Sequence, residues 1–276
     1  MSQTLTAFLS EGPAILVEIE AVKGSSPREA GTFMLVSATR IWETIGGGQF
    51  EYMAIDHARA ILDGRTEIDV LDIPLGPEIG QCCGGRTLLR FIKVTDSVAD
   101  ALITRMRKAE DQQPAVFIFG AGHVGKALAN SLSLLPLKVS VFETRREELI
   151  GVPGTVSTHL TAMPEAMVSN IPAGGAAIIV THDHALDFMI AKEALGRDDL
   201  AYIGMIGSKT KRATFANWVA REGHVGTLDN LVLPIGGTLV KDKRPAIIAA
   251  LVTSEVLHAI HRFVARAPAQ SGSAPR

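Results

Sequence analysis

The stretch AVFIFGAGHVGKALA, residues 115–129, decides the fold of the second half of the chain. Ala115–Phe119 is a continuous apolar run, which is typical of a parallel strand covered on both faces. It leads into Gly120-Ala121-Gly122-His123-Val124-Gly125, and the segment after Gly125 has helical character to about residue 134. Gly120 permits the tight turn, Gly122 lets the backbone approach a phosphate, and Gly125 lets helix and strand pack closely. The stretch therefore predicts the start of a Rossmann-type domain.

The remainder of the second half repeats the alternation of strand and helix that is typical of a parallel sheet. We expect strands at 138–142, 175–180 and 201–206, with a helix at 187–195 between the last two. Glu143 ends the second strand, where a carboxylate can accept hydrogen bonds from a ribose diol. The helix N-terminus offers N–H groups to a phosphate. The loop thus favours a dinucleotide ligand, and the alternative is a Rossmann scaffold that binds none.

The first half has a different organisation. Residues 14–22, 32–36, 40–44 and 86–94 have the pattern of strands, and residues 51–62 that of a helix ending at Gly64. The fold class we predict is α/β, with a small N-terminal α+β domain followed by a Rossmann-type parallel-sheet domain. The boundaries that we assign are 1–95 for the first domain, 96–114 for a linking helix, 115–266 for the Rossmann-type domain and 267–276 for a disordered tail.

Composition narrows the class of protein. The chain has 276 residues, of which 47% are hydrophobic and 20% charged, so it can bury the cores of two domains. The net charge of −2 and the lack of a basic block argue against a nucleic-acid partner. No export signal is visible at the N-terminus, and the apolar stretch 245–264 contains Glu255 and Arg262. We therefore expect an amphipathic helix there, no membrane span, and a cytoplasmic protein.

The two cysteines are adjacent, at Cys82 and Cys83. They could form only a strained vicinal disulfide, which favours a reducing compartment, and they cannot build a Cys₄ zinc site. Gly84 and Gly85 follow and would hold the backbone close to whatever the thiols face. Arg86, next in the chain, could lower a thiol pKa and bind an anion, as could Arg90. The alternative is a pair of small buried side chains.

Two further segments of the first domain have the composition of anion-binding turns. Gly24-Ser25-Ser26-Pro27-Arg28 combines small residues, hydroxyls and an arginine, and Gly46-Gly47-Gly48 opens a helix. Both can present N–H groups to a phosphate, and two tight turns without a ligand are the alternative.

Polar loops also follow the later strands of the second domain. In Thr181-His182-Asp183-His184 either Thr181 or Asp183 can cap a helix while the histidines line a pocket. A metal pair is less favoured, because no further ligand is evident nearby. After the next strand Ser208 can cap a helix, and Lys209, Lys211 and Arg212 suit a phosphorylated ligand or an acidic partner. A solvated basic face is the alternative for these cations.

Taken together, these segments resemble the XdhC/CoxI family, and the resemblance covers nearly the whole chain. It rests on segments in both halves that occur in one order: 24–28, 46–51, 83–85, 120–125, 181–187 and 202–209. The chain departs from many relatives after Pro234-Ile235-Gly236, where it continues Gly237-Thr238 rather than with a Thr-Pro-Glu-Glu-type helix start.

The resemblance implies a chaperone for the molybdenum cofactor, Mo-molybdopterin. Family members bind and protect this cofactor, assist its sulfuration and deliver it to the large subunit of xanthine dehydrogenase. The implied partners also include a sulfurating cysteine desulfurase, the proteins of cofactor biosynthesis and further copies of the chain in a homodimer or larger homo-oligomer. A family cysteine is tied to cofactor binding, and it corresponds to Cys83, with Cys82 less favoured. Cys83 is then also the predicted ligand of the cofactor's molybdenum.

The residues and the resemblance together give one set of predicted cofactor-binding positions, and they give no catalytic residue. A nucleotide in the Rossmann-type domain is a further expectation. The positions are Ser26, Arg28, Gly47, Gly48, Cys82, Cys83, Gly84, Gly85, Gly120, Gly122, His123, Gly125, Glu143, His182, Asp183, Ser208 and Lys209.

Two other functions compete with the carrier. An NAD(P)-dependent oxidoreductase would use the glycine loop and Glu143, but no catalytic domain is evident beside the Rossmann unit. A thiol redox protein would use the two cysteines, although exchange chemistry favours a spaced C-x-x-C pair. The interpretation as an accessory protein is preferred, so we expect no enzymatic activity of its own.

Overall fold

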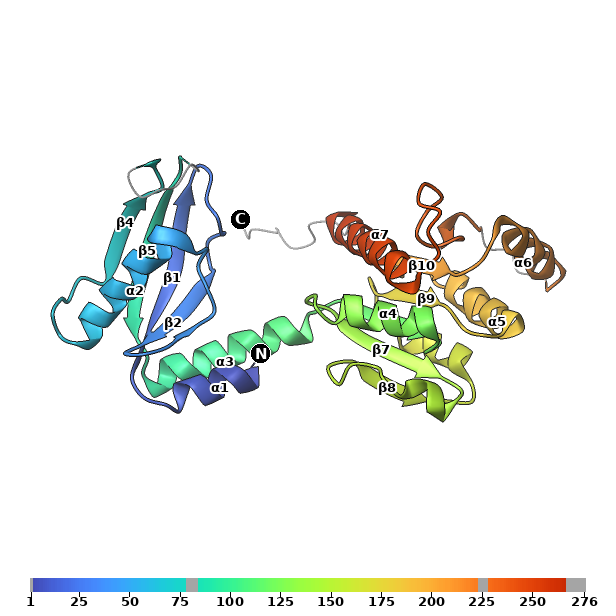
Figure 1. The fold of residues 1–276 in the computed structure, drawn as a ribbon, viewed down its shortest axis with the longest axis horizontal. Helices are drawn as coiled ribbons and strands as arrows, with labels where there is room; N and C mark the ends of the chain where they lie inside the picture. The colour runs from blue at the N-terminus through green and yellow to red at the C-terminus, as the bar shows by residue number, and fades with distance from the viewer. Residues whose placement is uncertain (1, 78–83, 223–227, 267–276) are drawn as a thin grey trace, which may run out of the picture. The chain divides into compact units, whose positions relative to one another are not determined.

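The computed structural model describes residues 2–77, 84–222 and 228–266. The chain forms two compact units, Met1–Asp111 and Gln112–Arg276 (Figure 1). Cys82, Cys83 and the predicted disordered tail 267–276 lie outside the described residues.

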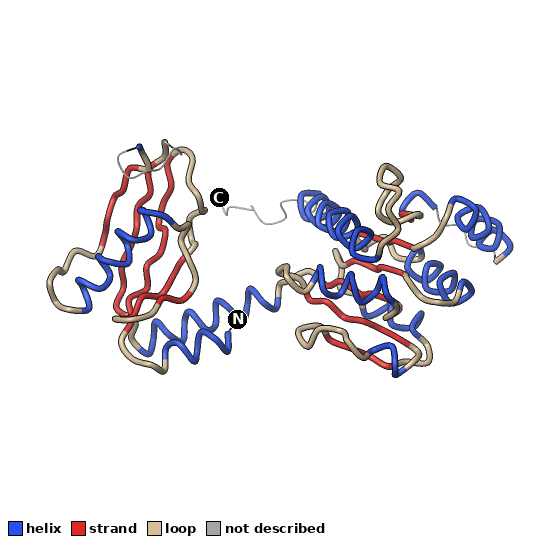
Figure 2. Tube along the Cα trace, in the orientation of Figure 1, coloured by secondary structure: helices blue, strands red, loops and turns tan. Residues whose placement is uncertain are grey.

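The first unit is built on a five-stranded antiparallel sheet with the order β3-β2-β1-β5-β4 (Figure 2). Its elements are α1 Ser2–Leu9, β1 Ala14–Lys23, β2 Phe33–Ser37, β3 Ile41–Trp42, α2 Gly48–Leu62, β4 Val70–Pro74, β5 Arg86–Lys93 and α3 Asp96–Asp111.

Both faces of this sheet are covered, as the central strand β1 illustrates. Successive side chains of a strand point to opposite faces. Ile15, Val17 and Ile19 enter the core beneath α2, whereas Leu16 enters a second core that includes Leu102 of α3. The alternation of side chains along β1 thus joins two hydrophobic cores through one sheet.

Helix α3 differs from the prediction for this segment. We expected residues 96–114 to link the two domains, but α3 ends at Asp111 and belongs to the first unit. Leu102 of α3 packs against Leu5 and Phe8 of α1, and Arg105 donates a hydrogen bond of 2.7 Å to Glu18 of β1. The helix is held there by a core that α1 completes, and the sequence analysis did not predict α1.

The second unit is a six-stranded parallel sheet with the order β11-β10-β9-β6-β7-β8. Numbered from the first strand of the unit, this order is 3-2-1-4-5-6 read from β8, which is the Rossmann arrangement. The predicted fold class is confirmed. The elements are β6 Ala115–Phe119, α4 His123–Leu132, β7 Lys138–Glu143, β8 Ser157–Leu160, β9 Ala176–Ile179, α5 His184–Leu195, β10 Tyr202–Met205, α6 Lys209–Arg221, β11 Leu231–Val232 and α7 Pro245–Arg266, with 3₁₀ segments at Arg146–Leu149, Pro164–Asn170 and Leu228–Asn230.

Helix α7 is long and apolar enough, by length and composition, to cross a membrane. One of its faces nevertheless belongs to the core of the unit, since Ala249, Val252, Val256 and Ile260 are buried in the cluster that contains residues of α4. The spacing of these four residues is that of an amphipathic helix packed on a folded domain.

The packing of α2 generates a prediction with a matched control on the same helix. Phe50 is fully buried, whereas Tyr52 is 64% exposed. We expect Phe50→Ala to lower the free energy of unfolding of the first unit by about 3–5 kcal/mol, because it leaves a cavity in the core. Tyr52→Ala should change it by less than about 0.5 kcal/mol. Urea unfolding followed by Trp42 fluorescence, in a Trp218→Phe background, measures both; equal effects of the two variants would contradict this packing.

Candidate functional site

The glycine loop of the second unit is shaped by two close approaches of backbone. Gly120 has φ +109°, and a Cβ there would lie 2.5 Å from the carbonyl oxygen of Val180. A Cβ on Gly125 would lie 2.0 Å from the carbonyl oxygen of Gly120. Gly122 is the N-cap of α4, and the space beside it is open to 4 Å. The helix therefore begins at His123 rather than after Gly125, and a Cβ on its N-cap residue would meet no other atom within 4 Å.

The strand order brings this loop to the segment after β9. Strands β6 and β9 are parallel neighbours, although α4, β7, β8 and two 3₁₀ segments separate them in the chain. A Cβ on Gly120 would also meet the Cα of Thr181 at 2.9 Å. The Gly120 turn and the Thr181–His184 segment are thus side by side at the point where the strand order reverses, which is where open α/β sheets bind ligands.

Glu143, the expected ribose acceptor, is occupied by the protein's own donors. Its side chain is 3% exposed, and its carboxylate accepts from the N–H of Ala121 at 2.8 Å, of Thr144 at 2.8 Å and of Arg145 at 3.1 Å. Burial raises the pKa of Glu143, but these N–H groups and the Arg145 side chain outweigh it, so the pKa lies below its ordinary value of 4.5. The carboxylate fixes the glycine loop from within.

A buried ion pair, which the sequence analysis did not predict, lies beneath the next two loops. Asp187 is fully buried and Lys211 is 9% exposed; Lys211 Nζ contacts Asp187 and donates to the carbonyl of Ile206 at 3.0 Å. Asp187 also accepts from the Thr181 hydroxyl at 2.6 Å and from its N–H at 3.1 Å. The pair therefore ties the loop after β9 to the loop after β10.

The exposed side chains at this edge are those nearest the helix starts. Asp183 caps α5, since its Oδ1 accepts from the N–H of Ala185 at 2.7 Å, and Ser208 caps α6 by accepting from the N–H of Lys211 at 3.2 Å. The exposed residues at the edge are His123, His182, Asp183, His184, Ser208 and Lys209.

The described residues bear on two sequence hypotheses about this edge. Within the described ranges, no group of three or more His, Cys, Asp or Glu side chains could hold a metal ion. The predicted cluster of three cations is divided, because Lys211 is buried and Arg212 donates to the carbonyls of Leu228 and Leu231 at 3.2 and 2.9 Å. The interpretation of all three as a solvated or ligand-binding basic face is wrong, and only Lys209 is exposed.

In the first unit the three glycine segments meet at one end of the sheet. Ser25 forms a bridge with Gly84, and a Cβ on Gly85 would lie 1.9 Å from the carbonyl oxygen of Ser25. On the other side of the same turn, a Cβ on Gly46 would lie 2.9 Å from Pro27. Segment 24–28 therefore contacts both of the other segments, and a side chain at Gly46 or Gly85 would clash with it.

The glycine triplet is held by Glu51 rather than open to an anion. The carboxylate of Glu51 accepts from the N–H of Ile45 at 3.0 Å, from the N–H of Gly47 at 3.2 Å and from the Thr44 hydroxyl. The N–H of Gly46 donates to Thr44 Oγ1 at 3.1 Å. The N–H groups of Gly46 and Gly47, two of the three glycines that we expected to face a phosphate, therefore already have acceptors.

The arginines near the glycine segments fall into two classes. Arg86 pairs with Asp72 at 2.6 Å and Arg90 with Glu20 at 2.7 Å, so both charges are balanced within the sheet. Arg28 is exposed and lines a pocket of about 210 Å³ together with Trp42. Of these three cations, Arg28 is the one placed to meet an anionic ligand.

The fold and these sites define a class of protein in which an antiparallel α+β unit precedes a Rossmann unit. The model of the XdhC Rossmann domain matches residues 116–256, and the model of the XdhC and CoxI family matches residues 8–73. The chain belongs to the XdhC and CoxI family, as its motifs predicted.

Two individual proteins show how far the similarity extends. The uncharacterized protein YqeB of Escherichia coli (strain K12) is 25% identical over 261 residues, which are 89% of this chain and 43% of that protein. The chain thus spans less than half of this curated relative. A crystal structure of a xanthine dehydrogenase from Bacillus halodurans has a TM-score of 0.79 at 17% identity, with 98% of this chain and 97% of that chain covered. This second likeness shows the shared fold.

An imine reductase from Myxococcus stipitatus, solved in complex with NAD+, is far less similar. Its TM-score is 0.31 at 16% identity, over 41% of this chain and 38% of that chain. A similarity this low says nothing about the function of this chain.

The lowered pKa of Glu143 predicts how the stability of the second unit depends on pH. Because the folded pKa is below the ordinary value of 4.5, the contribution of Glu143 is present above that pH and is lost as the pH falls through the folded pKa. We expect stability to decline less steeply below pH 4.5 in Glu143→Gln than in the wild type. Urea unfolding monitored by Trp218 measures this, with exposed Glu147→Gln as control. Equal slopes for Glu143→Gln and wild type would contradict the prediction.

The buried ion pair predicts a large effect from a single substitution. We expect Asp187→Ala to destabilise the second unit by about 3–5 kcal/mol, since it leaves the Lys211 charge buried without its partner. The double variant Asp187→Leu/Lys211→Met should recover part of the loss, and exposed Lys209→Ala should stay within about 0.5 kcal/mol of wild type. Trp218 fluorescence in a Trp42→Phe background reports the transition. A wild-type midpoint for Asp187→Ala would show that the pair is not formed.

Proposed function

We propose that this chain is an accessory protein in the maturation of a xanthine dehydrogenase-type molybdenum enzyme. In this proposal it binds the molybdopterin form of the cofactor as cargo, protects it during sulfuration and delivers it to the large subunit of the enzyme. Membership of the XdhC and CoxI family supports the accessory role. The solved relative from Bacillus halodurans is named a xanthine dehydrogenase, in agreement with this role.

The observation that carries the proposal is the meeting of the three glycine segments in the first unit. Segment 24–28 contacts Gly84 and Gly85 on one side and Gly46 on the other, and the cysteine pair is joined to Gly84 by the chain itself. Two groups of the right chemistry are thereby near one turn, since Arg28 is part of it and Cys83 precedes Gly84 in the sequence. A thiolate is a soft ligand suited to a sulfur-rich molybdenum centre, and Arg28 suits a phosphate.

The residues around this turn suit such a cargo in part, and each group of residues would have a different role. Cys83 would hold the metal, with Cys82 as the less favoured residue. Arg28 and Ser26 would bind the pterin phosphate, and Gly84 and Gly85 would let the backbone approach it. The N–H group of Gly47 is already bonded to Glu51, so Gly47 and Gly48 would shape the turn rather than bind the phosphate through that donor.

The carboxyl edge of the second unit is a separate proposed surface, for a nucleotide or for part of the cofactor. There the open space beside Gly122 and the N-terminus of α4 would receive a phosphate, between exposed side chains. The residues proposed for this surface are Gly120, Gly122, His123, Gly125, Glu143, His182, Asp183, Ser208 and Lys209. Of these, the buried Gly120, Gly125 and Glu143 would shape the loop rather than contact the ligand.

The partners of the proposed carrier follow from its task in the cytoplasm. It would meet the proteins that make the cofactor, a cysteine desulfurase that supplies sulfur, and the large subunit of the target enzyme. A homodimer or larger homo-oligomer is the proposed assembly.

An NAD(P)-dependent oxidoreductase is the second candidate, favoured by the Rossmann strand order and the loop at its switch point. The hydrogen bonds of Glu143 disfavour an oxidoreductase, because a ribose would have to compete with the N–H groups of Ala121, Thr144 and Arg145 for the carboxylate. Titration with NAD+ and NADP+ separates the two functions. Saturable dinucleotide binding by a protein that carries no molybdopterin would favour the oxidoreductase.

The carrier predicts a specific defect for one cysteine. Protein purified from a host that makes molybdopterin should contain molybdenum and yield a fluorescent oxidised pterin. We expect Cys83→Ala to lose most of both signals because the metal loses its thiolate ligand, whereas Cys82→Ala should retain them. Metal analysis and pterin fluorescence on the same preparations measure this. Equal loading of Cys83→Ala and wild type would refute the role of Cys83, and the absence of both signals from wild type would refute the carrier itself.

A further inference from the structure

A pocket of the second unit lies at the edge of the sheet opposite the glycine loop. It has a volume of about 470 Å³, and Ala201 and Ile203, at the start of β10, form part of its wall. The glycine loop and the Ser208 turn follow the ends of their strands, whereas this pocket lies where β10 begins. None of the predicted site residues lines it, so the pocket is a feature that the proposed function does not use.

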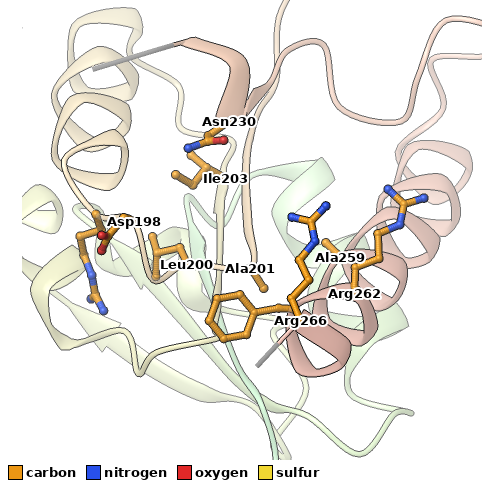
Figure 3. Close-up of a pocket in the computed structure, with 10 residues that line it drawn as sticks. Asp198, Leu200, Ala201, Ile203, Asn230, Ala259, Arg262 and Arg266 are labelled. Atoms are coloured by element: carbon orange, nitrogen blue, oxygen red, sulfur yellow. The ribbon is translucent and has the colours of Figure 1, made fainter. Parts of the chain in front are cut away.

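The last turns of α7 give the pocket two arginines. Ala259, Arg262, Phe263 and Arg266 recur at helical spacing and all line the pocket, so they form one stripe of α7. Figure 3 shows both guanidinium groups on the α7 side. Within residues 2–77, 84–222 and 228–266, neither Arg262 nor Arg266 forms an ion pair with a carboxylate. Two cations without a protein counter-ion favour an anionic ligand.

The opposite wall is fixed and carries a carboxylate. All three guanidinium nitrogens of Arg197 donate hydrogen bonds. They bind Asp199 at 2.6 and 2.8 Å and the carbonyls of Val168 and Ile171 at 2.9 and 2.6 Å. These bonds hold the connection between α5 and β10 in place. Asp198, next in the chain, is exposed on that connection and lies across the pocket from the arginines in Figure 3.

Between the two charged walls, apolar side chains line the pocket beside Asn230. Phe263 packs against Gly174, where a Cβ would lie 3.0 Å from two atoms of the ring. Leu200 and Ile203 line the pocket beside it. Phe263 is therefore positioned by a residue that has no side chain, and a flat ring system could lie against this apolar surface.

We propose that this pocket binds a phosphorylated heterocycle whose ring edge carries adjacent N–H donors, the chemistry shared by guanine nucleotides and pterin phosphates. Arg262 and Arg266 would bind the phosphate, because guanidinium groups match phosphate oxygens in pairs. Asp198 would accept hydrogen bonds from the ring N–H groups, and Leu200, Ile203 and Phe263 would contact the ring. The volume falls within the usual range for sites that bind small molecules.

The proposal is tested on the full chain with four probes in isothermal titration: GMP, AMP, guanosine and inorganic phosphate. GMP should bind most tightly, because AMP lacks the pair of adjacent N–H donors, guanosine lacks the phosphate, and phosphate lacks the ring. A pterin monophosphate as a fifth probe identifies the source of the ligand. Tighter binding of the pterin than of GMP would assign the pocket to pterins, and the reverse would assign it to guanine nucleotides.

Variants locate the binding. Arg262→Ala/Arg266→Ala should weaken GMP binding at least about tenfold, as expected for the loss of a charge-assisted phosphate contact. Asp198→Asn should weaken GMP but not AMP. Arg221→Ala removes an exposed arginine from α6, outside the pocket, and should leave binding unchanged. These side chains are exposed, so unfolding midpoints should stay at the wild-type value.

Two results would overturn the proposal. The first is no saturable binding of GMP or of the pterin phosphate up to about 1 mM, which corresponds to a binding free energy of about −4 kcal/mol. The second is equal affinity of the double arginine variant and the wild type. Cys83→Ala should bind GMP like wild type. A failure of the carrier function through Cys83 is therefore distinguishable from a failure of this pocket.

Discussion

The close approach of three backbone segments at Gly120 and Gly125 is the constraint on which the second unit depends. A Cβ on Gly125 would lie 2.0 Å from the Gly120 carbonyl oxygen, and one on Gly120 would lie 2.5 Å from that of Val180. No side chain fits at either distance, so β6, α4 and the end of β9 can converge only through glycine. That convergence aims the N-terminus of α4 at the switch point of the sheet and brings Thr181 beside it. Gly85 has the corresponding role in the first unit, 1.9 Å from the Ser25 carbonyl oxygen.

A second feature is common to the two units. In each, a glycine loop that could cradle an anion is fixed by a glutamate of the protein. Glu51 accepts from Ile45 and Gly47, and Glu143 accepts from Ala121. The loops are thereby preorganised, and the donors used in this way are not free for a ligand. Recognition of a ligand then depends on exposed side chains near the loops, such as Arg28 and Lys209, and on the remaining backbone of the turns.

The sequence predicted the parts of the fold that have a strong local signal. Ala115–Phe119 is recognisable because both faces of a central parallel strand are apolar, and β1 because its residues alternate between two cores. Strands β8 and β11 were missed for physical reasons. All four residues of β8 are exposed at the edge of the sheet, so no apolar pattern marks them, and β11 has only two residues. Strand β4 was also missed, because only Ile73 of its five residues is buried.

At the candidate site, too, the sequence identified only part of the arrangement. Spacing alone showed which residues follow the strands, but not the partners that they find in the folded chain. Lys211 and Lys209 are alike in the sequence, yet one side chain is buried against Asp187 and the other is exposed. Only the spatial neighbourhood of β9 and β10 decides between them. The same holds for Glu51, whose contacts with the glycine triplet depend on where α2 begins.

Hydrogen exchange of the cofactor-loaded and cofactor-free protein can show whether the glycine segments of the first unit hold the cargo. We expect loading to slow amide exchange at residues 24–28 and 84–86, with a smaller change or none in strands of the second unit such as β8. Unchanged exchange at these turns in a protein shown to carry the cofactor, with slowing confined to 120–125 and 181–184, would contradict it.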